Sequence, residues 1–156
     1  MAKIYLGLGT NLGDKKQNLR CAMSKIEERV GKIISLSAFY MTEPWGFDSG
    51  NSFLNAVTCI ETFLLPVDVL TKTQDIEREM GRTKKSVSGV YSDRLIDIDL
   101  LLYDDCIIHS EELTLPHPLM MERLFVLQPL CEIAPELYNP ETRIRFIDAL
   151  RELEGK

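Results

Sequence analysis

Two aspartates, Asp97 and Asp99, interrupt an otherwise apolar run between Arg94 and Tyr103. The β-branched and apolar residues of this run predict a strand, and a strand directs alternate side chains to opposite faces. The two carboxylates therefore share one face, with their Cα atoms about 6.6 Å apart. The opposite face is expected to be core and holds Ile96, Ile98, Leu100 and Leu102.

Two carboxylates that leave an apolar strand in the same direction repel each other and are costly to desolvate. A divalent cation removes both problems. Mg²⁺ is commonly held by one or two carboxylates, with water and substrate phosphate oxygens completing its shell. A solvated strand face that carries two acids is the simpler interpretation of a bare Asp-x-Asp. The apolar flanks and the preceding Arg94 favour a metal–phosphate site instead.

A basic loop leads directly into this strand, and its sequence is Arg82-Thr83-Lys84-Lys85-Ser86-Val87-Ser88-Gly89-Val90-Tyr91-Ser92-Asp93-Arg94. Arginine binds phosphate oxygens through paired hydrogen bonds and lysine binds them as a point charge, so the loop could neutralise a phosphate beside the acids. A solvated basic loop is the alternative. Further along, Pro116 and Pro118 restrict the backbone on both sides of His117. This histidine is a candidate ligand for the same phosphate, with a structural role as the alternative.

Composition narrows the class of protein. The 156 residues are 45% hydrophobic and 27% charged, as in ordinary globular proteins, and we expect one domain over residues 1–156. The net charge of −6 argues against nucleic acid as a partner. No apolar run approaches the roughly 20 residues of a membrane helix, and the N-terminal apolar stretch is too short for a signal peptide. We expect a cytoplasmic monomer whose cysteines are reduced core residues: Cys21, Cys59, Cys106 and Cys131.

The elements that position these residues follow from periodicity. Residues 3–9 alternate as a first strand, and the glycine-containing segment 7–14 is interpreted as a tight turn because it lacks the spacing of a nucleotide-binding loop. Asp14 and Gln17 form a capping-box pattern before a first helix that ends at Gly31. A second helix runs from Pro66 to Gly81. Its buried stripe is expected to be Val69, Leu70, Thr73, Ile76 and Met80.

Two further strands are predicted between the helices, over about 33–42 and 53–62. In the second, Phe53 and Asn55 share a face with apolar residues, and both ends of the asparagine amide need partners there. A ligand ring or neighbouring backbone would supply them. The intervening loop carries Trp45, which either closes over a ligand or packs on the domain.

The order of elements is strand–helix–strand–strand–helix–strand. After the acid strand we expect a short strand continuation at 107–108, a third helix from Arg123 and a C-terminal helix over about 143–153. This order predicts an α+β protein with a ferredoxin-like split βαβ fold, a mainly antiparallel sheet with helices packed on it.

Short motifs along nearly the whole chain point to one family. They are Gly9-Thr10-Asn11-Leu12-Gly13, Phe39-Tyr40-Met41-Thr42-Glu43-Pro44, Phe53-Leu54-Asn55-Ala56, Gln74-Asp75-Ile76-Glu77 with Gly81-Arg82, Asp97-Ile98-Asp99-Leu100, and Pro116-His117-Pro118 with Arg123 and Phe125-Val126-Leu127. In this order and spacing they closely resemble the 6-hydroxymethyl-7,8-dihydropterin pyrophosphokinase family of folate biosynthesis. The resemblance implies an ATP-dependent transferase that moves the β,γ-diphosphate of ATP to the hydroxymethyl group of a reduced pterin and releases AMP.

The resemblance also implies roles for individual residues. Two Mg²⁺ ions on Asp97 and Asp99 would bridge the ATP phosphates, with Arg82 and Arg94 acting beside them. ATP would be held by Gln74, Glu77, Lys84, Lys85, Ile98 and His117. The family's usual mid-loop arginine and tryptophan are absent, so Lys84 or Lys85 would carry the phosphate charge and Tyr91 would supply the aromatic cover. The pterin site would consist of Thr42, Glu43, Trp45, Phe53, Asn55, Arg123 and Phe125. In it the two phenylalanines sandwich the ring and Asn55 reads its edge. Such a site suits phosphoryl-type transfer, which needs positioning and charge neutralisation more than covalent help.

Two other functions are compatible with parts of the sequence. Nucleotidyltransferases of the polymerase-β type also carry a hydrophobic–Asp–hydrophobic–Asp pattern, but they place a Gly-Ser or Gly-Gly turn shortly upstream, and this sequence has none at a suitable distance. A non-catalytic ferredoxin-like module would bind a small ligand without consuming ATP, which leaves the acid pair beside a basic loop without a purpose.

Overall fold

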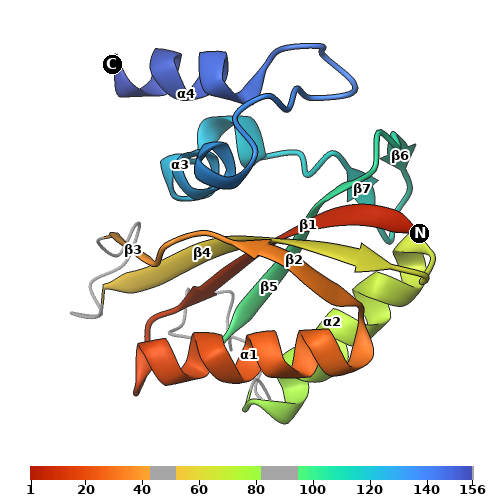
Figure 1. The fold of residues 1–156 in the computed structure, drawn as a ribbon, viewed down its shortest axis with the longest axis vertical. Coiled ribbons are helices and arrows are strands. Elements are labelled where there is room, and N and C mark those ends of the chain that lie inside the picture. The colour runs from red at the N-terminus through yellow and green to blue at the C-terminus, as the bar shows by residue number, and fades with distance from the viewer. Residues whose placement is uncertain (43–51, 82–94, 156) are drawn as a thin grey trace.

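An antiparallel sheet forms the centre of the fold (Figure 1). The computed structural model describes residues 1–42, 52–81 and 95–155. The strands of the sheet are β1 (Ala2–Thr10), β2 (Lys32–Leu36), β3 (Tyr40–Thr42), β4 (Phe53–Thr62) and β5 (Asp97–Tyr103). Their order is β2–β4–β1–β5, and β3 also pairs with β4. Because β4 lies between β1 and β2, this is the split βαβ arrangement that the sequence predicts.

Helices cover both faces of the sheet. One face packs on α1 (Lys15–Arg29) and α2 (Pro66–Glu79), and the other on α3 (Leu124–Ile133), with α4 (Phe146–Glu154) packed on the far side of α3 (Figure 1). Two separate clusters of buried apolar side chains fill the two layers. The α2 stripe is buried or half-buried as expected. The sheet is therefore the wall between two cores.

The connection from β1 to α1 differs from the predicted turn in its position. β1 extends to Thr10, so Gly7 and Gly9 lie in the strand and only Gly13 takes the left-handed turn conformation, at φ 64°. Asp14 caps α1 by accepting a 3.1 Å hydrogen bond from the backbone N–H of Gln17. The predicted cap is thus confirmed, and the turn begins later than expected.

The strand predicted over 33–42 is interrupted. The Ser37 hydroxyl accepts a 2.9 Å hydrogen bond from the backbone N–H of Val57 and donates one of 2.8 Å to the Ala38 carbonyl. A side chain thereby takes the place of a backbone partner in the ladder. The chain consequently forms two short strands, β2 and β3, instead of one.

This interruption also shifts the register. Leu36 lies opposite Thr58 and Tyr40 lies opposite Asn55, so three residues between the two pairs on one side lie opposite two on β4. Alternation predicts that Ile34 and Leu36 share an apolar face of this strand. In the structure both side chains are exposed, at 43% and 40%, on an edge strand of the sheet. A bulge earlier in β2 is the physical reason: Ile33 lies opposite Ile60 and Ser35 opposite Cys59, which leaves Ile34 as an extra residue, and a bulge changes which face the following side chains reach.

A second bulge corrects the expectation for Leu102. Leu6 pairs with Leu100 and Tyr5 with Leu102, which leaves Leu101 as the extra residue of β5. Leu101 and Leu102 both pack in the cluster under α3 and α4, whereas Leu100 packs under α1 and α2. Strict alternation therefore predicts the face of each β5 residue up to Leu101 and fails at Leu102.

The segments after β5 also depart from the prediction in part. The short strand β6 (Ile108–His109) does not continue β5 but pairs with β7 (Thr114–Leu115) in a separate two-stranded sheet. A 3-10 turn over Met120–Glu122 precedes α3, whose cap is Arg123 as expected. The four cysteines are free, and only Cys59 and Cys131 are buried, so the core expectation is wrong for the half-exposed Cys21 and Cys106. Among the described helices, none combines the length and apolar character needed to span a membrane.

Candidate active site

Asp97 and Asp99 lie on the face of the sheet that α3 covers. Ile98 and Leu100 pack into the core under α1 and α2, while Leu101 packs under α3. Since successive strand residues alternate, both aspartates share the side of Leu101, and both are half-buried. The predicted separation of the acids from the aliphatic side chains is therefore present up to the bulge.

The pairing of three strands places these acids in line with Asn55. The two cross-strand rows are Asn55–Gly9–Asp97 and Val57–Gly7–Asp99. Adjacent strands lie about 4.8 Å apart, so the Cα atoms of Asn55 and Asp97 are roughly 10 Å apart. Glycine has no side chain, and the surface between Asn55 and Asp97 is therefore bare backbone. Such a floor lets a flat ligand lie across β1.

The edge of this floor beyond Asn55 is formed by β3. Thr42 pairs with Phe53, and the Asn55 side-chain amide donates a 2.9 Å hydrogen bond to the Thr42 hydroxyl. Asn55 is only 4% exposed, whereas Phe53 is half-buried. A buried amide beside a partly exposed aromatic ring suits a flat heterocycle with polar edges.

The first residues of α3 reach the same region. Arg123 caps the helix, and its guanidinium carbon lies 5.5 Å from the centroid of the Phe125 ring. Both side chains are half-buried. A cation over an aromatic face stabilises both groups, so Arg123 helps to hold the Phe125 ring in place.

His117 is hydrogen-bonded to β5, the strand that carries Asp97 and Asp99. Its backbone N–H donates a 3.0 Å hydrogen bond to the carbonyl of Leu101, two residues after Asp99. The Nδ1 atom of its ring accepts a 3.2 Å hydrogen bond from the backbone N–H of Leu119, which leaves Nε2 to carry the proton of the neutral ring. Burial lowers the pKa of His117, the nearby Arg123 lowers it further, and Asp97 opposes them. His117, Arg123 and Asp97 therefore lie close enough to influence one another.

Glu77 contacts β5 between the two acids. Its carboxylate accepts a 2.8 Å hydrogen bond from the backbone N–H of Ile98, and the side chain is buried. Gln74 lies one turn earlier on α2 and is exposed. The structure thus joins Glu77 to Ile98 directly, two residues that the resemblance assigns to ATP. Glu77 also anchors the outer edge of β5.

The remaining predicted site residues fall outside the described part of the chain. They are Glu43, Trp45, Arg82, Lys84, Lys85 and Arg94. Their roles stay predictions.

The donor chemistry of the acid face fits Mg²⁺. Asp97 and Asp99 offer carboxylate oxygens, the ligands that this ion prefers, and water and phosphate ordinarily complete its shell. Within residues 1–42, 52–81 and 95–155, no cluster of three or more His, Cys, Asp or Glu side chains could hold a metal ion. The described residues therefore suit an ion shared with substrate phosphates rather than one enclosed by protein.

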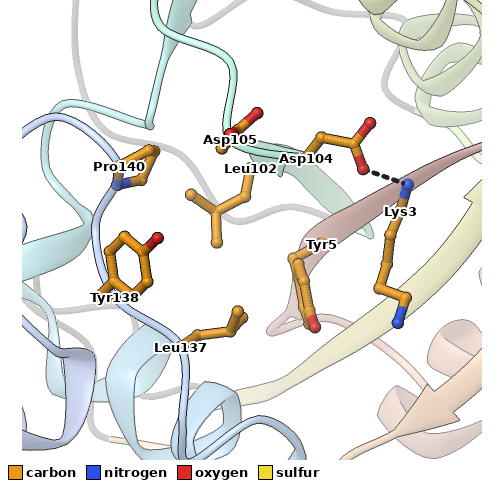
Figure 2. A pocket seen from close by; sticks show the side chains of 8 residues that line it. All are labelled: Lys3, Tyr5, Leu102, Asp104, Asp105, Leu137, Tyr138 and Pro140. Atoms are coloured by element: carbon orange, nitrogen blue, oxygen red, sulfur yellow. Dashed lines mark hydrogen bonds between the residues drawn. The ribbon is translucent and has the colours of Figure 1, made fainter.

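A cavity of about 190 Å³ lies away from this region, at the opposite end of β1 and β5 (Figure 2). Figure 2 shows the residues that line it: Lys3, Tyr5, Leu102, Asp104, Asp105, Leu137, Tyr138 and Pro140. In this lining, the Asp104 carboxylate accepts a hydrogen bond from the backbone N–H of Lys3. None of the predicted site residues lines it. The candidate site is therefore the face that carries Asn55, Gly9 and Asp97.

Sequence reasoning missed two features of the site. Gly7 and Gly9 were interpreted as part of a turn, although glycines two residues apart beside a strand are a signal for a bare strand face. Glu132 and Tyr40 were given no role, yet their side chains are hydrogen-bonded to each other. These two residues are 92 positions apart, so no local pattern could have joined them.

Comparisons with known proteins point to one family. A family model described as 7,8-dihydro-6-hydroxymethylpterin-pyrophosphokinase (HPPK) matches residues 5–135. A Porphyromonas gingivalis protein named 2-amino-4-hydroxy-6-hydroxymethyldihydropteridine pyrophosphokinase is 52% identical over 139 residues, covering 88% of this chain and 95% of the relative. The Aquifex aeolicus protein of the same name is 41% identical over 140 residues, covering 90% of this chain and 85% of the relative.

A solved structure of similar fold is that of wild-type Plasmodium falciparum HPPK-DHPS, with a TM-score of 0.79 and 17% sequence identity. The match covers 97% of this chain and 44% of that chain, so this chain spans less than half of the solved protein. At this identity the likeness supports the fold alone.

The fold and the named relatives define a ferredoxin-like α+β transferase, and the candidate site lies on one face of its sheet. The family model matches most of the chain, and the match to the Porphyromonas gingivalis protein covers 95% of that relative. The chain therefore belongs to the 7,8-dihydro-6-hydroxymethylpterin-pyrophosphokinase family.

Proposed function

We propose that this protein transfers the β,γ-diphosphate of ATP to the hydroxymethyl group of 6-hydroxymethyl-7,8-dihydropterin and releases AMP, a step of folate biosynthesis. One observation carries the proposal within the family: the row Asn55–Gly9–Asp97 joins a buried amide to an acid across bare backbone. A pterin bound at one end of this row would present its hydroxymethyl group toward the other.

The pterin end of the site would use stacking and hydrogen bonds. Phe53 and Phe125 would contact the two faces of the ring, and Asn55 and Thr42 would bind its polar edge. Aromatic stacking adds on the order of 1 kcal/mol to area burial, and a buried polar edge left without partners would cost about 1–3 kcal/mol for each group. The hydrogen bonds therefore orient the pterin, and the rings hold it.

The phosphate end would rely on charge and position. His117 would donate from Nε2 to a phosphate oxygen, because its Nδ1 is occupied by the Leu119 N–H. Arg82, Arg94 and the two adjacent lysines would neutralise the phosphates, and Gln74, Glu77 and Ile98 would contact the nucleotide. Little covalent chemistry is required of the protein when a phosphoryl-type group is transferred between well-placed oxygens.

Asp97 and Asp99 would hold two Mg²⁺ ions, which supply charge neutralisation at the ATP phosphates. At this end of the row, the carboxylates would lie near the pterin hydroxyl. A cytoplasmic location and a monomer built on one domain complete the proposal, and sedimentation of the purified protein tests the oligomeric state.

A single assay tests the function. The purified protein is incubated with ATP, Mg²⁺ and the reduced hydroxymethylpterin, and the nucleotide products are separated. We expect AMP in equal amount to pterin diphosphate. Release of pyrophosphate would instead identify a nucleotidyltransferase, and unchanged ATP in the presence of bound pterin would identify a binding module. Either result would overturn the proposal.

A further inference from the structure

Glu132, near the end of α3, makes a cluster of hydrogen bonds to the segment that leads into β3. Its two carboxylate oxygens lie 3.2 and 3.0 Å from the backbone nitrogen of Ala38, which donates to them. The Tyr40 hydroxyl donates to the same carboxylate at 2.5 Å. Hydrogen bonds to a charged acceptor are about twice as strong as neutral ones. An exposed glutamate that accepts from both a backbone and a side-chain donor is therefore a well-defined link.

The link joins the two walls of the proposed pterin site. On α3, Glu132 follows Phe125 by about two helical turns, so both residues lie on the same side of the helix. On β3, Tyr40 pairs with Asn55 and Thr42 pairs with Phe53. The carboxylate thus connects the helix that carries one aromatic wall to the strand that flanks the other wall.

The segment that Glu132 holds lies between two stretches that pair with β4. The Ser37 backbone N–H still donates a 2.9 Å hydrogen bond to the Val57 carbonyl, and pairing resumes at Tyr40 in β3, which is only three residues long. Short strands depend on contacts beyond their own ladder for a fixed position. Because the Ala38 N–H points to Glu132, the carboxylate takes over where the ladder to β4 is interrupted.

We propose that Glu132 is a positioning residue for pterin binding: by holding Ala38 and Tyr40, it fixes the separation of Phe125 from Phe53 and Asn55. The proposal rests on the proposed function. A pterin ring stacked between two aromatic side chains requires a fixed distance between Phe53 and Phe125. Loss of the Glu132 link increases this distance and removes no group that contacts the ligand. ATP binding lies at the other end of the row and does not depend on this separation.

The test compares Glu132→Ala with Glu132→Gln and measures the Kd of the reduced pterin, the Kd of ATP with Mg²⁺, and Tm. Pterin binding is measured with and without an unreactive ATP analogue. We expect Glu132→Ala to weaken pterin binding about tenfold, a ratio that corresponds to 1.4 kcal/mol. ATP binding should stay within about twofold. Glu132→Gln should recover most of the pterin affinity, since its amide oxygen still accepts one of the hydrogen bonds.

Two further variants keep the test decisive. Glu152→Ala removes an exposed carboxylate from α4 and should leave both affinities unchanged. Tyr40→Phe removes one of the two donors to Glu132 and keeps the ring, so it should weaken pterin binding by a smaller factor than Glu132→Ala. It serves as the test if Glu132→Ala does not fold.

A spectroscopic titration reports the link without any substrate. The hydrogen bond to Glu132 raises the pKa of Tyr40 to about 12. In Glu132→Ala, one more tyrosine than in wild type should therefore ionise near pH 10, as measured by tyrosinate absorbance. This extra absorbance should be absent when Tyr40→Phe is combined with Glu132→Ala, which identifies the residue as Tyr40.

The possible outcomes separate the two proposals. If wild-type protein releases no AMP from ATP and the pterin, the proposed function fails. If the wild type is active and Glu132→Ala binds the pterin as tightly as wild type, or loses ATP affinity equally, the role of Glu132 is overturned.

Discussion

The side-chain amide of Asn55 donates a hydrogen bond to the hydroxyl of Thr42, at 2.9 Å and across the boundary between β4 and β3. This bond fixes which end of the amide faces β3. The other end, the Oδ1 atom, lies over Gly9, because a Cβ built on that glycine would be only 3.0 Å from it. Asn55 therefore presents its acceptor toward the bare floor of the proposed site.

We expect Asn55→Leu to weaken pterin binding at least as much as Phe53→Leu. Leucine keeps the branching of asparagine at Cγ but leaves the polar edge of the ligand unpaired, at a cost of about 1–3 kcal/mol for each buried group. Loss of one stacked ring costs on the order of 1 kcal/mol beyond area burial. Calorimetry with the reduced pterin measures both, and ATP affinity serves as the control. Unchanged pterin affinity in Asn55→Leu would remove this residue from the site.

Gly9→Ala should weaken pterin binding about tenfold. Its new Cβ would lie 3.0 Å from Asn55 Oδ1 and 3.9 Å from Phe53 Cδ1, so the amide must shift by a few tenths of an ångström and the floor beside it is no longer bare. Gly7→Ala is the matched control, because its Cβ makes only an ordinary 3.5 Å contact with Leu101. The two variants are compared by pterin titration. Equal effects at both positions would contradict the placement of the ligand over Gly9.

Asp97→Asn and Asp99→Asn should each abolish turnover and leave the fold intact. Each change removes one negative charge from a like-charged pair, so Tm of the metal-free protein is expected to stay the same or rise. Circular dichroism, thermal unfolding and the AMP-release assay in Mg²⁺ check these expectations together. Near-wild-type turnover by either variant would show that the metal site is assigned to the wrong residues.

Glu77→Ala should destabilise the protein by about 1–3 kcal/mol, because it leaves the buried N–H of Ile98 without its acceptor. Gln74→Ala on the exposed side of the same helix is the control and should change the free energy of unfolding by less than about 0.5 kcal/mol. Urea unfolding followed by circular dichroism measures both. If the two variants were equally stable, the link between α2 and β5 would be of no energetic importance.

His117 should make stability depend on pH in the metal-free protein. Burial and then Arg123 lower its pKa below the ordinary 6.5, so the folded state favours the neutral ring. The unfolded chain binds this proton more readily. Stability from His117 is therefore fully present above about pH 6.5 and is lost as the pH falls through the folded pKa.

A single-histidine background makes this measurable. The chain has two histidines, so His109→Asn leaves only His117 to titrate in NMR spectra. Arg123→Ala should raise the pKa of His117 by removing a neighbouring positive charge. A pKa at or above 6.5 in the background protein, or no rise in Arg123→Ala, would contradict the described surroundings of the ring.

The sequence alone determined the elements and most of the faces. Period-two alternation correctly paired Phe53 with Asn55 and Asp97 with Asp99, and Asp14 marked the start of α1. These features follow from backbone geometry over a few residues, because side chains alternate along a strand and orphan N–H groups need caps at a helix start. The family resemblance then supplied roles that the residues by themselves left open.

Only the tertiary structure decided how the faces meet. The row from Asn55 across Gly9 to Asp97 depends on the register of three strands, and the turn of Leu102 into the other core depends on a bulge opposite β1. The link from Glu132 to Ala38 spans 94 positions and lies where a strand that alternation predicts to be continuous is interrupted. Alternation is a local property of one strand. Register, bulges and distant hydrogen bonds are set by which partners the completed fold brings together.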